Sequence, residues 1–305
     1  MRYTRIPEDT KNFDWNSMKG EHISLGVSSD EGKSWNWTYI SKNDYDDRPW
    51  VEVASDGSAH VIWNDGKGVH YTYSNDQGKN WQKRPDIHNL GGSSHFAVGP
   101  EGQLAVRISP LSASGVTFNE GLDLLKVSLD LGKTWKTVEL PGQRDWSPNM
   151  DKGTPRWVEP LAWDEAGHLY YLWSEGQALK LGRSQNNGQD WETYSVASSS
   201  DTIFYPYLTA KDGYLSCTWI SGFDDALRHQ AAVLQLNQGK LKVSRLEPQK
   251  LVEIQSRFGE STQLWTGGEY FPMKRLANGD FGMVTTIQNY KDNRLGFSYW
   301  ILRLK

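Results

Sequence analysis

The sequence predicts an all-β fold, a β-propeller of four-stranded antiparallel blades, and three observations lead to this prediction. An octet of the pattern Ser-x-Asp-x-Gly-x-x-Trp occurs four times, beginning at Ser28, Ser74, Ser128 and Ser184. The octets begin 46, 54 and 56 residues apart. Short β-rich runs separated by Gly, Asp and Asn turns fill the intervals, without helical periodicity. Repeats of about 50 residues with four strands each are typical of propeller blades.

Each octet has the chemistry of a tight hairpin turn. We expect the Asp carboxylate, or the Asn186 amide in the fourth octet, to accept hydrogen bonds from nearby backbone N–H groups. The Gly supplies a positive φ. The Trp ring packs between sheets, which explains much of the content of 15 Trp residues. These acidic residues are therefore predicted to be structural and to lie on the outer rim.

Strand pairs recur at five places along the chain. The first strand of a unit is expected to begin near residues 48, 94, 156, 205 and 270. The last two units keep the strands and lack the octet, whereas the first octet has no full pair of inner strands before it. Propellers commonly close by completing one blade from both chain ends, and the strand at 295–303 could meet N-terminal strands in this way. We therefore expect six blades in one domain spanning residues 1–305, with five blades or a truncated larger propeller as the alternatives.

The composition excludes several classes of function. The formal net charge is −4 with 23% charged residues, so no basic surface for nucleic acid is expected. No apolar run reaches the ~18 residues of a membrane span, and the N-terminus lacks the apolar segment of a signal peptide. The protein is then either intracellular or has lost its signal. The one cysteine, Cys217, allows no intrachain disulfide and lies in a strand pattern that favours burial. We expect a monomer.

Polar side chains stand where each innermost strand is expected to start. A propeller places its ligand site at the mouth of the central channel, because every blade contributes residues there. Carboxylates, arginines and tyrosines converging on one axis indicate a functional site. The residues at these equivalent points are Asp46, Asp47, Arg48, Ser93, Ser94, His95, Arg156, Glu159, Tyr205, Tyr207, Glu269 and Tyr270.

The four octets and the blade layout resemble the sialidase-like (BNR, or Asp-box, repeat) superfamily over nearly the whole chain. In that superfamily the Asp box is specific for the fold and not for one activity. The resemblance implies a carbohydrate ligand, and a secreted or periplasmic location if a signal was removed. Arg5-Ile-Pro7 looks like the motif that begins the arginine triad of sialidases, and Glu159 looks like their strand-start Glu. However, Arg5 lies only 23 residues before Ser28, which leaves little room for the acid/base loop of that family.

We predict a glycoside hydrolase acting on an acidic sugar at the central channel, with no cofactor and no metal. Paired carboxylates suit glycosidic acid/base chemistry, and Glu159 with Asp47 is the predicted pair. A tyrosine becomes nucleophilic when a carboxylate takes its proton. Arginine grips a carboxylate with two hydrogen bonds. The predicted nucleophile or positioning groups are Tyr205, Tyr270 and Glu269, and the predicted substrate-binding residues are Arg48, Arg275, His95, Arg156 and Tyr207.

Two other functions fit the same residues. A polysaccharide lyase would neutralise a uronate with Arg48 or Arg275 and move a proton with His95 or Tyr205. A binding or protein-interaction propeller would transfer no proton and would stack sugar rings on aromatic side chains. Those rings are Trp50, Trp157, Tyr205, Tyr207, Trp265 and Tyr270. The sequence shows no Cys cluster, no His-Glu-x-x-His and no phosphate loop, so neither zinc nor nucleotide chemistry is indicated.

Overall fold

The structure is a computed structural model, and its described residues form β-strands joined by turns. These residues are 22–43, 46–65, 67–89, 92–109, 121–142, 145–146, 159–223, 226–237, 240–242, 252–254, 271–289 and 294–303.

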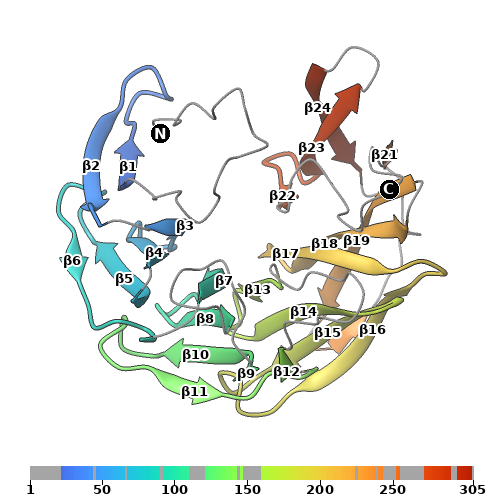
Figure 1. Ribbon diagram of the computed structural model, residues 1–305, viewed down its shortest axis with the longest axis horizontal. Coiled ribbons are helices and arrows are strands. Elements are labelled where there is room, and N and C mark those ends of the chain that lie inside the picture. Colours follow the sequence, from blue (N-terminus) through green and yellow to red (C-terminus); the bar gives the residue numbers. More distant parts are fainter. Residues whose placement is uncertain are drawn as a thin grey trace, which may run out of the picture.

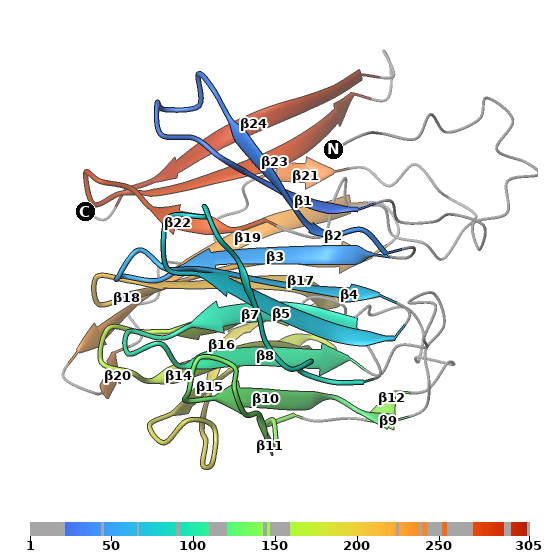
Figure 2. The same cartoon turned by 90° about the vertical axis from the view of Figure 1, so that its left-hand side faces the viewer.

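The strands form successive antiparallel sheets around a central axis, with β3, β7, β13, β17 and β22 nearest the centre and β6, β11, β16 and β24 toward the rim (Figure 1). Seen from the side, the sheets lie one above the next (Figure 2). Five of the sheets are blades, which confirms the predicted all-β propeller. Six blades are not shown among the described residues.

Three blades have four strands each, in simple up-and-down order. Each is named by its first and last strand. The β3–β6 blade contains β3 (Asp47–Val53), β4 (Ala59–Asp65), β5 (Gly68–Ser74) and β6 (Gln82–Lys83). The β7–β11 blade contains β7 (Gly92–Val98), β8 (Leu104–Ser109), β10 (Leu124–Ser128) and β11 (Lys136–Val138). The β13–β16 blade contains β13 (Leu161–Trp163), β14 (Leu169–Glu175), β15 (Ala178–Ser184) and β16 (Glu192–Ser198).

The remaining sheets depart from this pattern. The β17–β21 blade contains β17 (Ile203–Lys211), β18 (Tyr214–Phe223), β19 (Ala226–Asn237) and β20 (Lys240–Lys242), with β21 (Val252–Ile254) also paired to β19. The β22–β24 blade has three described strands, β22 (Met273–Arg275), β23 (Phe281–Asn289) and β24 (Arg294–Leu302). Two small sheets pair β1 (Ile23–Val27) with β2 (Asn36–Ser41), and β9 (Gly121–Leu122) with β12 (Asp145–Trp146).

The hydrophobic core is divided among the interfaces between neighbouring blades. Ile62 and Tyr71 of the β3–β6 blade pack with Phe96 of the β7–β11 blade in one cluster, and all three are fully buried. Three further clusters join the later blades pairwise. Blades in the middle of the stack are covered on both faces, and their inner strands are buried along their length, as in β8. Cys217 is buried in one of these clusters, as the sequence predicts.

The four Asp boxes share the hydrogen bonds that their Ser and Asp or Asn side chains accept from the backbone, and three of the boxes add a contact from the Trp ring. In the second box, Ser74 Oγ accepts the Gly78 N–H at 2.8 Å, and Asp76 Oδ1 accepts the Asn80 N–H at 2.9 Å. Trp81 Nε1 donates to the Gly78 carbonyl at 3.1 Å. Asn186 reproduces the carboxylate contact in the fourth box, accepting the Asp190 N–H at 2.9 Å. The acidic residues therefore hold turns together, as predicted.

The backbone of these turns is more strained than the sequence indicates. Besides the glycine, the residue before it also has a positive φ, as at Gln77 (62°) and Leu131 (57°). Such a conformation is uncommon for residues with a Cβ atom. The Ser and Asp side chains of the box supply hydrogen bonds that hold it in place.

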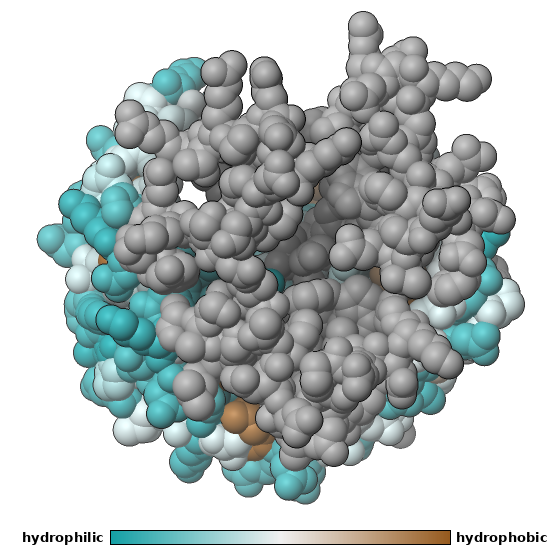
Figure 3. Space-filling view, viewed as in Figure 1, coloured by the Kyte–Doolittle hydropathy of each residue, from teal (hydrophilic) through white to brown (hydrophobic). Residues whose placement is uncertain are grey.

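The β1–β2 hairpin carries the first Asp box and packs on the β3–β6 blade. Ile23 lies against Val61 and Trp63, just as neighbouring blades pack elsewhere. The hairpin's outer residues are exposed, with Trp37 at 63% and Tyr39 at 60% of their surface. Where the rim is coloured in Figure 3, it is mainly hydrophilic.

Candidate functional site

The first strands of three blades are irregular where they begin. The register shifts between Asp47 and Trp50 on β3, between Ser93 and His95 on β7, and between Phe204 and Tyr207 on β17. A bulge re-aims the side chains that follow it and is often found next to a functional site.

Two of these bulges contain a strained residue followed by proline. Arg48 has φ 50° and Tyr205 has φ 48°. Positive φ in a residue with a side chain persists only where the surroundings enforce it. The bulges therefore fix which side chains enter the channel.

Three rings from different blades meet after the bulges. The ring centroids of Trp50 and His95 are 4.9 Å apart, and those of His95 and Tyr207 are 5.3 Å apart in an edge-to-face arrangement. His95 Nδ1 accepts a hydrogen bond of 3.2 Å from the backbone N–H of Leu161 on β13. His95 is thus fixed by contacts with three other blades.

A cavity of about 350 Å³ occupies the channel beside these rings. It is lined by His95 and Tyr207, and also by residues further along the first strands and by the turns that follow them. Its volume lies near the lower end of the roughly 300–1,000 Å³ of small-molecule sites. Its polar lining includes Glu52, Thr209, Lys274 and Arg275.

Charges of both signs face this cavity. Burial raises the pKa of Glu52, and the positive charge of Lys274 only partly offsets this effect. The guanidinium of Arg275 lies 4.4 Å from the Tyr214 ring centroid, and its Nε is 3.3 Å from Asp212 Oδ2. The Nη1 atom of Arg275 is buried without a hydrogen-bond partner among the described residues. The cavity lining therefore includes a carboxyl group biased toward its neutral form, a lysine whose charge acts on it, and an arginine paired with Asp212.

Burial lowers the pKa of His95 to about 3, and the nearby charges of Lys274 and Arg107 act in the same direction. The imidazole is therefore neutral at physiological pH. Because Nδ1 accepts a hydrogen bond, the single proton resides on Nε2.

Glu159 lies in a buried charge network between two blades. Its Oε2 atom is 3.0 Å from Nη2 of Arg107, which is also 2.8 Å from Asp123 Oδ2. The hydroxyl of Tyr171 donates to the same Oε2 atom of Glu159. The side chains of Arg107, Asp123 and Glu159 have no exposed surface, so this network joins β8 to the segment before β13 inside the protein.

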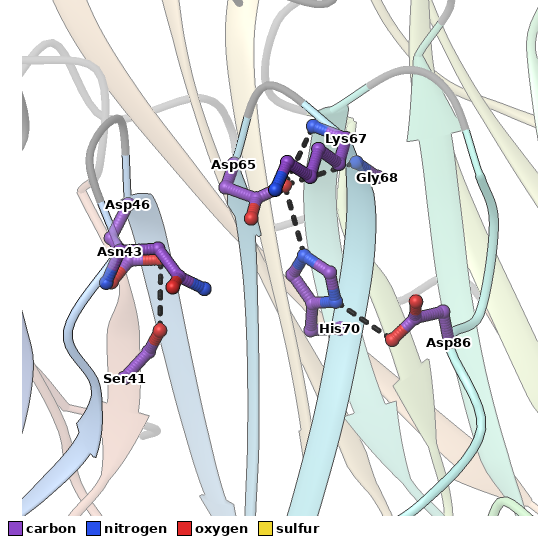
Figure 4. A network of polar contacts seen from close by, with 8 residues as sticks. All are labelled: Ser41, Asn43, Asp46, Asp65, Lys67, Gly68, His70 and Asp86. Atoms are coloured by element: carbon purple, nitrogen blue, oxygen red, sulfur yellow. Dashed lines mark hydrogen bonds and ion pairs between the residues drawn. The ribbon is translucent and has the colours of Figure 1, made fainter.

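Another polar network lies near the ends of β2, β4 and β5 (Figure 4). The ring of His70 lies between two carboxylates, with Nε2 3.0 Å from Asp65 Oδ1 and Nδ1 2.7 Å from Asp86 Oδ1. Asp46 is buried nearby and accepts hydrogen bonds from Ser41 Oγ and the Asn43 N–H. Burial raises the pKa of Asp46. These contacts tie the strand connections together.

The structure brings three of the predicted site residues to the cavity, namely His95, Tyr207 and Arg275. Asp47 is largely exposed at the strand start, where its carboxylate accepts the Arg48 N–H at 2.8 Å. Tyr205 packs in the cluster between the β17–β21 and β22–β24 blades, and Glu159 is enclosed by its network. Arg5, Arg156, Trp157, Trp265, Glu269 and Tyr270 lie outside the described residues.

Sequence reasoning missed Glu52, Lys274 and Arg107. Glu52 follows Trp50 by two positions, so the two share one face of β3, and this alternation could have found it. Lys274 adjoins the predicted Arg275. Arg107 ends a plain apolar strand pattern, and nothing in the sequence pairs it with Glu159.

The described part of the chain shows neither a metal-ligating cluster nor a membrane-spanning helix. No group of three or more His, Cys, Asp or Glu side chains there is arranged to hold a metal ion. In the same part of the chain, no helix is long and apolar enough to cross a membrane.

Comparisons with known proteins agree on the fold. Residues 72–83, which include the second octet, match the BNR/Asp-box repeat. A variant of the NanB sialidase from Streptococcus pneumoniae superposes with a TM-score of 0.52 at 11% identity, covering 92% of this chain and 63% of that one. The α-L-arabinofuranosidase Arb93A from Fusarium graminearum superposes with a TM-score of 0.50 at 13% identity, covering 92% and 85%. No curated protein matches in sequence.

These findings define the class of protein. The chain is a β-propeller that carries a BNR/Asp-box repeat, and its fold is similar to that of a sialidase propeller, so the predicted resemblance is confirmed at this level. It is distantly similar in structure to propellers of glycoside hydrolases. The chain spans about 63% of the length of the NanB chain, and identities this low establish the fold alone.

Proposed function

We propose that this protein is a glycoside hydrolase that binds an acidic sugar in its central channel. The observation that carries this proposal is the cavity formed by five blades, in which Glu52 has a raised pKa beside Lys274 and Arg275. Glycosidases need a carboxylic acid that keeps its proton near neutral pH, and burial is the usual means.

In this proposal Glu52 protonates the oxygen of the leaving group. The second carboxylate is Glu165, which lines the same cavity and accepts the Asp212 N–H with only one of its oxygens. Lys274 and Arg275 neutralise the carboxylate of the sugar, and Tyr207 lies beside it.

A competing arrangement places the chemistry at the strand starts. There Asp47 and Glu159 would be the acid/base pair, with Arg48, Arg156, Tyr205, Glu269 and Tyr270 around the sugar. Asp47 and Glu52 cannot form one pair, because five positions along a strand span roughly 17 Å and a catalytic pair needs about 5–10 Å. Separate variants therefore distinguish the two arrangements.

We also propose that the β1–β2 hairpin is the outer half of a sixth blade. It carries an Asp box like the third and fourth strands of three other blades, and it packs on the β3–β6 blade as a neighbouring blade would. Among the described residues β1 pairs only with β2, so its inner edge is open to two further strands.

The test is a panel of aryl glycosides, including a sialoside and an arabinofuranoside, together with uronate-containing polysaccharides. Release of reducing ends that is lost in Glu52→Gln, and kept in Asp47→Asn, supports hydrolysis in the cavity. Loss in Asp47→Asn alone moves the chemistry to the strand starts.

Two results would replace the proposal. Ultraviolet absorbance of unsaturated products would identify a lyase. No turnover on any substrate, combined with measurable binding to a glycan, would leave a recognition propeller.

A further inference from the structure

His95 combines burial with a free hydrogen-bonding position. The residue lines the cavity and is only 3% exposed. The Nε2 atom has no hydrogen-bond partner among the described residues. A buried donor without a partner is costly, which is a reason to expect that a ligand supplies one.

The two nitrogens of this ring have different roles. Nδ1 accepts the Leu161 N–H at 3.2 Å, so the proton of the neutral ring is on Nε2. The rings of Trp50 and Tyr207 pack against the imidazole and oppose its rotation. Nε2 is thus a donor whose position and tautomer are both set by the protein.

The Leu161 amide is itself placed by a charge network. Glu159 lies two residues before Leu161, and its carboxylate contacts Arg107 and Tyr171. Arg107 is the partner of His95 in the β7–β8 register. The ion pair therefore holds the segment before β13 against the strand pair that carries His95.

We propose that His95 donates a hydrogen bond from Nε2–H to an oxygen of the sugar in the cavity, and that Arg107 and Glu159 are positioning residues for this donor. The inference rests on the proposed function, because it takes the cavity as the sugar site. It assigns Glu159 a role through Leu161 and not through contact with the sugar.

An Nε2–H group fixed in this way can donate to a ring, hydroxyl or carboxylate oxygen, and the imidazole cannot take up a further proton. Its Nε2 already carries one, and its Nδ1 lone pair is engaged by Leu161. The charges that act on the ring are those of Lys274 and Arg107, and both are cations that offer no acceptor. The proton-abstracting role that a lyase would require of His95 is therefore disfavoured.

The first test needs no substrate. Two-bond ¹H–¹⁵N correlation spectra of ¹⁵N-histidine-labelled protein identify the protonated nitrogen of each ring, with His95→Gln providing the assignment. We expect the Nε2–H form, unchanged between pH 8 and about 4, because the pKa is about 3. An Nδ1–H form, or titration in the ordinary range of histidine, would overturn the proposal whether or not the protein is a hydrolase.

The positioning role is tested in the same spectra with Glu159→Gln. Loss of the ion pair should loosen Leu161 and produce a mixture of both tautomers at His95. Arg183→Met is the matched control, because Arg183 is also a buried arginine but lies on β15 and contacts Glu192. An unchanged His95 signal in Glu159→Gln, or an equal change in Arg183→Met, would remove Arg107 and Glu159 from this role.

The ligand contact is tested with sodium glucuronate, N-acetylneuraminic acid and L-arabinose as probes. At least one should shift the Nε2–H resonance of His95. The same probe should bind His95→Gln, which keeps a side-chain N–H near Nε2, within about threefold of the wild type. His95→Asn places its amide nearer Nδ1 and should lose at least tenfold. Equal binding by both variants, or no shift with any probe, would make His95 purely structural.

Discussion

The rim and the channel of this propeller use side chains in opposite ways. At the rim, the side chain at the Asp position of all four octets accepts the same backbone N–H, and Asn186 keeps this contact. In the channel, equivalent positions of successive blades hold four different residue types, namely Trp50, His95, Leu161 and Tyr207. Residues that repeat from blade to blade therefore shape the blades. Residues that differ between blades serve the one place in the channel that each of them occupies.

The buried network between β8 and β13 should show the largest effect on stability. Arg107→Leu leaves Asp123 and Glu159 as buried charges, and breaking such a pair costs about 3–5 kcal/mol. Arg228→Leu is the control, because Arg228 and Asp201 are each about one-third exposed and surface pairs contribute about 0–1 kcal/mol. Urea unfolding of both variants measures the difference. Equal losses would mean that the network does not join the two blades.

Substitution of two turn glycines by alanine should give the next largest difference in stability. Both have a positive φ, at 75° for Gly132 in the third Asp box and 84° for Gly57 between β3 and β4. A Cβ at Gly132 would lie 2.3 Å from the buried Tyr71 ring, whereas one at Gly57 meets nothing within 4 Å. Gly57→Ala should cost about 1 kcal/mol for the backbone alone, and Gly132→Ala about 1–3 kcal/mol more. Thermal unfolding would contradict this account if Gly57→Ala were the worse variant.

Glu52 should reduce stability slightly at neutral pH, in contrast to the rim carboxylates. Burial raises its pKa in the folded protein. The free energy of unfolding is therefore highest below the pKa of the unfolded chain, where the carboxyl group is neutral in both states, and it falls as pH rises through the folded pKa. Glu52→Gln mimics the neutral form and should be as stable as the wild type or slightly more stable at pH 7. A clear fall in melting temperature would show that the ionised form makes contacts essential to the fold.

Asp130 should show the smallest effect and the opposite dependence on pH. Hydrogen bonds from the Thr134 hydroxyl and N–H lower its pKa to about 2. Its contribution is therefore present above the unfolded pKa and is lost as pH falls from about 4 through 2. Asp130→Asn should melt at the same temperature as the wild type at pH 7, because Asn186 holds the equivalent turn of the fourth box. The stability of this variant should also fall less between about pH 4 and 2. Asp130→Ala should melt lower, and equal melting of Asn and Ala variants would refute the turn's hydrogen-bonding role.

The sequence predicts the parts of the molecule that repeat. The octets specify the turns through local chemistry, because Ser, Asp and Gly act within a few residues of one another. The number of blades is harder to predict from the sequence, because the β1–β2 hairpin forms a sheet separate from the five blades. The positive φ of residues such as Leu131 could not be expected from a side chain that disfavours it.

The site is harder to predict, because it depends on contacts between blades. The predicted residues His95, Tyr207 and Arg275 line the cavity, whereas Tyr205 and Glu159 are enclosed between blades. Glu159 has a favourable sequence position, yet only the fold places Arg107 beside it. Long-range pairing between non-repeating residues leaves no pattern in a single sequence.

The measurement that tests the central claim most directly is the rate of sugar release by the wild type, Glu52→Gln and Glu31→Gln on the best substrate of the panel. Glu31 is an exposed carboxylate in the first Asp box, far from the channel lining in sequence and outside the cavity. Losing a general acid typically costs about 10²–10⁴-fold in rate. We predict a loss of that size in Glu52→Gln with Glu31→Gln unchanged. Full activity in Glu52→Gln would show that the channel cavity does not perform the chemistry.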